Sequence, residues 1–131
     1  MKPNTLLTGL SLLSIVLCTF HLTDDIVYGW EPGRLATLYA LPIFVAWLYG
    51  ALLLRERLSG YIILMLGSIV SLGIPMIHMS GKGIGTASRV ANTSGHRFFV
   101  WTLLMLAMSG FFSLVLSAQA LWRRDWRRSE R

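Results

Sequence analysis

Four long stretches of the sequence contain no Asp, Glu, Lys or Arg. Each stretch has between 20 and 25 residues, and a helix needs about 20 apolar residues to cross the hydrocarbon core of a bilayer. A soluble four-helix bundle would carry a charged face on every helix, which these stretches lack. We therefore expect an all-α integral membrane protein: one domain of 131 residues with four transmembrane helices in an antiparallel bundle. The expected spans are approximately 5–27, 35–55, 58–79 and 97–122.

The distribution of positive charge predicts the orientation. With the N-terminus inside, the inner side holds eight Lys and Arg residues and the outer side holds four. Five of the inner ones are Arg residues of the tail 123–131. We expect both termini in the cytoplasm, a location in a bacterial cytoplasmic membrane, and a tail that contacts anionic lipid headgroups. The residues expected at the headgroups are Trp122, Arg123, Arg124, Trp126, Arg127 and Arg128.

Small and polar residues recur at helical spacing inside the apolar stretches. Because lipid is as apolar as Leu, membrane helices associate through small residues and polar contacts, so these residues indicate the inward faces. Pro42 should bend the second helix near its outer third. The expected packing residues are Ser11, Ser14, Cys18, His21 and Asp25 on the first helix, Ala36, Ala46 and Gly50 on the second, Gly60, Gly67, Ser71 and His78 on the third, and Ser109, Ser113 and Ser117 with a second strip of Ala107 and Gly110 on the fourth.

Two strips of small residues on the fourth helix suggest that one faces the bundle and the other a partner. We therefore expect an accessory or scaffold subunit that packs with itself or with a larger membrane complex, rather than an enzyme, and no nucleic-acid partner. Absent residues support this expectation. No acidic residue lies in the middle of a stretch, as a proton-coupled exporter would need, and Cys18 is the only cysteine, so a paired-thiol oxidase is excluded.

The one group with potential chemistry consists of His and Asp residues near the outer surface. His21, His78 and His96 fall at one membrane level under this topology, and Asp24 and Asp25 follow His21 by one helical turn. Imidazole and carboxylate ligands from several helices suit a divalent metal, with zinc or iron favoured by ligand type. The second carboxylate would orient a ligating His. His21 and His78 on facing helices would also suit a b-type haem.

Other interpretations of these residues stay open. The headgroup region is wet, so His and Asp residues at helix ends need no ligand, and the sequence has no His-Glu-x-x-His or His-x-x-x-His motif. The second alternative is a lipid-binding or small-molecule-binding bundle, because its pocket would be apolar and would leave no mark in the sequence. The accessory subunit, the metal or haem protein and the lipid-binding bundle therefore remain the three hypotheses.

Overall fold

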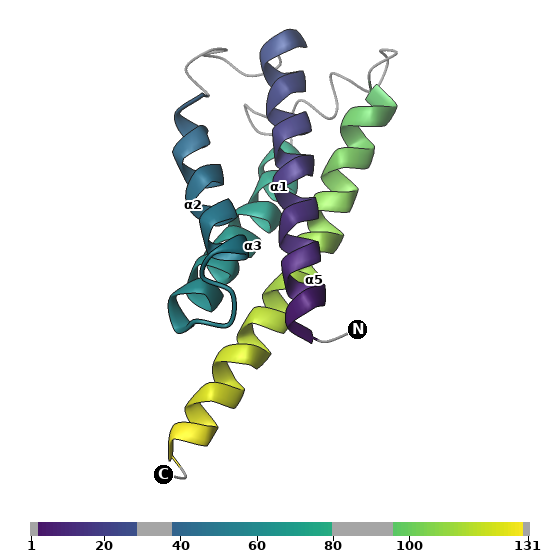
Figure 1. Ribbon diagram of the computed structural model, residues 1–131. Helices are drawn as coiled ribbons and strands as arrows, with labels where there is room; N and C mark the ends of the chain where they lie inside the picture. The colour runs from purple at the N-terminus through teal and green to yellow at the C-terminus, as the bar shows by residue number, and fades with distance from the viewer. Residues whose placement is uncertain (1–2, 29–37, 80–95, 130–131) are drawn as a thin grey trace.

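The computed structural model describes residues 3–28, 38–79 and 96–129 (Figure 1). Within them, side chains are described except at Met79, His96, Arg97 and 124–129. The described part is helical, as expected, and contains four helices: α1 (Pro3–Tyr28), α2 (Leu41–Leu52), α3 (Leu58–Met79) and α5 (His96–Ser129). Three of these helices, α1, α3 and α5, are long and apolar enough to cross a membrane.

Helix α2 is shorter than the span 35–55 expected from the sequence. A 3₁₀ turn at 38–40 leads into it, and Pro42 occupies its first turn. A proline fits there because the first-turn N–H groups have no partner inside the helix and the proline φ already matches the helical value. Pro42 therefore starts α2 instead of bending it, which corrects the expectation. Ala36 lies outside the described residues.

A tight turn joins α2 to α3. The amides of Leu53 and Leu54 both donate to the Tyr49 carbonyl, at 2.9 and 3.2 Å. Glu56 has a φ of 67°, in the left-handed region, where the chain reverses. Gly60 packs directly on this turn, because a Cβ at that position would overlap the Leu54 carbonyl. The turn makes α2 and α3 an antiparallel hairpin.

Small residues set the closest contacts between the helices. Helix α5 packs on both α1 and α3, while α2 packs on α3 and α1 (Figure 1). The ring of Trp47 in α2 lies over Gly67 of α3, where a Cβ would overlap the indole. Gly110 of α5 lies against Ser68 and Ser71 of α3, and a Cβ there would crowd both residues. Without these glycines the backbones could not approach so closely.

The interior face of α1 carries five residues, here called the polar seam: Ser11, Ser14, Cys18, His21 and Asp25. All five are buried, in line with their spacing. In the half of the seam nearer the N-terminus, here called the inner half, the Ser14 hydroxyl donates to Ser109 Oγ at 2.8 Å. The hydroxyls of Ser11 and Ser113 are 3.1 Å apart. Polar pairs between α1 and α5 therefore hold this half of the bundle together.

Both strips of small residues on α5 are used inside the chain. Ser109 and Ser113 face α1, whereas Gly110 is buried against α3 and Ala107 is half-buried. The reason is that α5 lies between two helices and needs a close-packing face for each. This arrangement leaves neither strip exposed for a partner, although the sequence suggested that one strip would be.

Ala46 is exposed, which corrects its expected place on an inward face. Helix α2 turns Phe44 and Trp47 to the core instead, and the Trp47 ring fills the space that Gly67 leaves on α3. Ala46 lies in an open apolar groove of about 520 Å³, whose lining residues are Leu41, Pro42, Val45, Ala46, Tyr49 and Ile63.

Candidate metal centre

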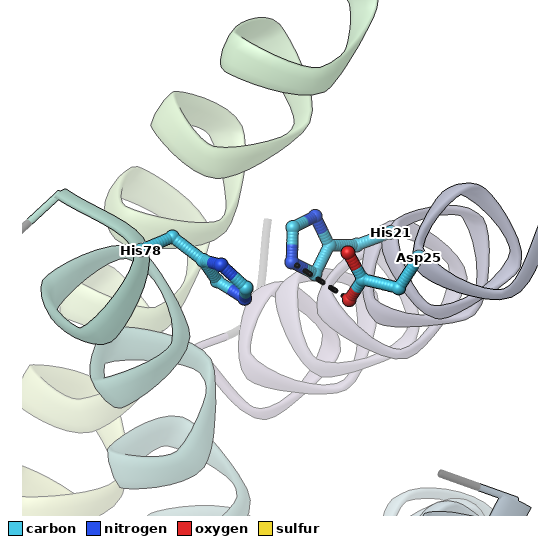
Figure 2. Close-up of side chains that lie close together, drawn as sticks. All are labelled: His21, Asp25 and His78. Carbon is cyan, nitrogen blue, oxygen red and sulfur yellow. Dashed lines mark ion pairs between the residues drawn. The ribbon is translucent and has the colours of Figure 1, made fainter. Parts of the chain in front are cut away.

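The other half of the polar seam, here called the outer half, contains His21 and Asp25 and faces a histidine from another helix (Figure 2). His21 and Asp25 come from α1, and His78 comes from the last turn of α3. One potential ligand atom from each residue lies within 4.8 Å of the other two. The three residues are only 3%, 5% and 6% exposed, so the group is inside the protein. A polar cluster of this composition and burial is unusual in an interior that is otherwise apolar or hydroxyl-bearing.

Helical spacing positions the two α1 members of the group. His21 and Asp25 are four residues apart, so their side chains lie on the same face, one turn from each other. The distance from His21 Nε2 to Asp25 Oδ2 is 3.5 Å. The carboxylate therefore lies beside the imidazole without a hydrogen bond to it. Both groups can then bind the same third atom.

Phe99 of α5 covers the two imidazoles. Its ring centroid lies 4.7 Å from that of His21 and 5.7 Å from that of His78. The two imidazole centroids are 4.6 Å apart, in an edge-to-face arrangement. Since Phe99 is only 1% exposed, the ring seals this side of the group. The site thus draws on three helices: ligand atoms from α1 and α3, and an apolar cover from α5.

Among the described residues, the imidazole of His21 has no hydrogen-bond partner. Within the described residues, neither Nδ1 nor Nε2 forms a hydrogen bond, although both atoms are buried. A neutral imidazole has one donor and one acceptor, and a buried polar group left unsatisfied costs roughly 1–3 kcal/mol. Evolution rarely retains such a cost without a reason, and a bound ligand is one of the standard reasons. A metal ion would accept the lone pair of one ring nitrogen.

The donor set suits a transition-metal ion. Two imidazole nitrogens and one carboxylate oxygen are ligands that zinc and iron accept in proteins. For bonds of about 2.0–2.2 Å in tetrahedral geometry, ligand atoms are roughly 3.4 Å apart. The 3.5 Å between His21 Nε2 and Asp25 Oδ2 already matches that spacing. The α1 pair is therefore arranged as two adjacent ligands would be.

The structure separates the five residues that the sequence proposed as ligands. His21, Asp25 and His78 come together, whereas Asp24 is half-buried and is not part of the group. A helical turn of 3.6 residues brings position 25 closer than position 24 to the face of His21. The side chain of His96 lies outside the described residues.

Phe99 is the member of this site that the sequence did not reveal. An aromatic residue near the outer end of a membrane helix is expected at the lipid interface, and nothing in its spacing sets Phe99 apart from its exposed neighbour Phe98. The available signal is helical register, because Phe99 precedes Thr102, Leu106 and Ser109 on one continuous buried face of α5.

Compared with known protein families, curated proteins and solved structures, the chain gives no significant match.

Proposed function

We propose that this chain is a small integral membrane protein that binds a divalent transition-metal ion, zinc or iron, through His21, Asp25 and His78. The observation that carries the proposal is the buried His21 imidazole, which has no hydrogen-bond partner among the described residues and lies beside a carboxylate and a second imidazole. A metal ion would accept a lone pair from each of the three groups. The buried carboxylate also offsets part of the charge of the ion.

A bare ion suits this group better than a b-type haem. Phe99 contacts both imidazoles, and the edge-to-face His pair leaves no flat gap between the rings. A porphyrin placed between His21 and His78 would have to displace Phe99 from the core. A single ion needs only small movements of side chains that already lie within 4.8 Å of one another.

We further propose four crossings with both termini in the cytoplasm, α2 belonging to the second crossing. The excess of Lys and Arg on the side of the termini supports this orientation. It places the metal centre in the outer half of the membrane, because His21 and His78 lie near the ends of α1 and α3 that are remote from the N-terminus and from the α2–α3 turn. Reporter fusions at the two termini should both report the cytoplasm. A periplasmic signal from either one would overturn this topology.

Metal content tests the proposed function directly. Untagged protein, purified in mild detergent and incubated with zinc or ferrous iron, is desalted and measured by elemental analysis. We expect about one ion per chain in the wild type and none in H78A. A matched control is the pair D25N and D24N, since only Asp25 belongs to the group. A wild-type chain that retains no metal would overturn the proposal, as would equal metal loss in D24N and D25N.

An accessory subunit of a membrane complex is the second candidate. It is supported by a row of exposed apolar residues on α5 that follows the three-and-four spacing of a helix interface: Trp101, Leu104, Met108, Phe111 and Val115. The same surface suits lipid, so the interface needs its own test. Trp101→Ala together with Phe111→Ala should release a co-purifying subunit and leave the metal content unchanged. The third hypothesis, a lipid-binding bundle, has support only from the open groove beside α2.

A further inference from the structure

The metal centre needs one more movement to reach bonding geometry, and that movement falls on His78. The ligand atoms lie within 4.8 Å of one another, whereas tetrahedral ligands are roughly 3.4 Å apart. The α1 pair is already at 3.5 Å. Because His21 and Asp25 are fixed relative to each other by one helix, closure of the site must bring His78 toward α1.

Building on the proposed metal site, we propose that Pro75 is a positioning residue, which lets the outer end of α3 move His78 onto an ion held by His21 and Asp25. Pro75 lies inside α3, three residues before His78, and both residues are buried. A proline has no N–H, so the Ser71 carbonyl cannot receive the usual helical hydrogen bond from position 75. The last turn of α3 is therefore joined to the rest of the helix by fewer backbone bonds.

Contacts with other helices are described for the part of α3 before Pro75. Toward the inner side, α3 is held: Trp47 covers Gly67, and the Ser71 hydroxyl donates to the Leu106 carbonyl of α5 at 3.0 Å. Toward the outer side, Met76 is 73% exposed, whereas the most exposed large apolar residue of α3 before Pro75, Leu66, is 55% exposed. Pro75 lies between the segment that carries these two contacts and the last turn, which carries Met76.

Two further features allow the outer end of α3 to approach α1. The helices α1 and α3 contact each other less than either contacts α5, so no tight interface between them has to be broken. Gly73, two residues before Pro75, has open space beside it, since a Cβ there would meet no atom within 4 Å. A small bend between positions 73 and 75 would therefore meet little steric resistance.

Zinc affinity provides the first test. Competition with a chromophoric chelator is measured on the full chain in detergent for the wild type, P75A and G9A. P75A restores the N–H that bonds to the Ser71 carbonyl, and we expect it to bind zinc about tenfold more weakly, the scale of losing one supporting contact at a metal site. G9A is the matched control, because Gly9 also has open space beside it but lies on α1, far from the site along the helix. Its affinity should equal that of the wild type.

Spin labels provide a readout that does not depend on the Pro75 variant. V27C and M76C place labels at exposed positions on the outer ends of α1 and α3. The native Cys18 is buried, so the two exposed cysteines react with the label before it does. Dipolar broadening in continuous-wave spectra should show that zinc brings the labels closer in the otherwise wild-type chain, and less so in P75A.

The outcomes separate this inference from the proposed function. If the wild type binds no zinc, the metal site fails, and the role of Pro75 fails with it. If the wild type binds zinc while the label distance is unchanged, His78 moves by side-chain rotation alone, and only the role of Pro75 fails. Equal zinc affinity in P75A and the wild type would overturn that role as well. If P75A does not fold, the label distance in the wild type decides the question.

Discussion

The polar seam of α1 behaves differently in its two halves. In the inner half, the hydroxyls of Ser11 and Ser14 meet those of Ser113 and Ser109 across the contact with α5. In the outer half, one to two turns further along the same face, His21 meets an imidazole, a carboxylate and a phenyl ring, and has no hydrogen-bond partner among the described residues.

The difference shows how to interpret polar residues in the interior of a membrane protein. A hydroxyl can satisfy itself within a helix or across one contact, so a row of serines is a means of packing. Ser117, which donates to the Ser113 carbonyl at 2.7 Å, follows the same rule. An imidazole at similar burial cannot reach its own backbone in this way. The unsatisfied imidazole of His21 is the observation on which the proposed ligand site rests.

The largest expected effect is on zinc affinity, which should depend on the outer half of the polar seam and not on the inner half. H78A should weaken zinc binding more than 100-fold, because it removes one of the three proposed ligands, while the helical content stays unchanged. S14A should retain wild-type affinity, because Ser14 belongs to the inner half. Chelator competition measures both. If the two variants lose zinc to a similar degree, the seam acts as one unit and the comparison fails.

Zinc should stabilise the fold through the outer half alone. At a free zinc concentration 100 times Kd, the free energy of unfolding should rise by about 2.7 kcal/mol. Unfolding in mixed detergent micelles, followed by circular dichroism, measures the change. The increase should persist in S14A and vanish in H78A. Stabilisation of H78A by zinc would place the ion elsewhere in the chain.

The two neighbouring carboxylates allow a finer comparison within the outer half. D25N should weaken zinc binding about tenfold or more, since an amide oxygen is a poorer ligand than a carboxylate. D24N should bind zinc like the wild type, because Asp24 is half-buried and outside the group. The decisive observation is which variant binds zinc more weakly. If D24N binds it more weakly than D25N, then Asp24 is the ligand.

The smallest expected effect concerns the inner half. A double-mutant cycle of S14A and S109A should give a coupling energy of about 0.6 kcal/mol, the average for hydrogen bonds between membrane helices. The 2.8 Å bond between the two hydroxyls is the interaction that the cycle removes. A coupling near zero would mean that close packing, rather than hydrogen bonding, holds α1 against α5.

The sequence contains enough information to find the inward faces of three helices. The heptad spacing of the seam on α1 places Ser11 through Asp25 inside, and Gly67, Ser71 and His78 on α3 are also buried. Small and polar residues indicate the inward faces because they are enriched where membrane helices contact one another. His21 and His78 could therefore be brought to one level from the pattern alone.

Other features depend on how the helices are placed relative to one another. The pattern on α2 was misleading, since Ala46 is exposed and the bulky Trp47 enters the core over Gly67. In the sequence, Phe99 cannot be distinguished from an aromatic residue at the lipid interface. Its buried position follows only from the placement of α5 between α1 and α3. To decide whether Asp24 or Asp25 faces His78, the rotation of α1 about its axis must be known to within a fraction of a turn. The pattern of small residues alone does not give the rotation that accurately.

The rate at which Cys18 reacts with a thiol reagent can measure how often the helix bundle opens. It is the only cysteine of the chain, it lies one turn from His21 on the seam, and it is 1% exposed. A thiol reagent can reach its sulfur only during the moments when α1 separates from its neighbours, so the rate of modification counts those openings. The wild-type protein therefore allows local opening of the bundle to be measured next to the candidate metal centre, without an introduced label.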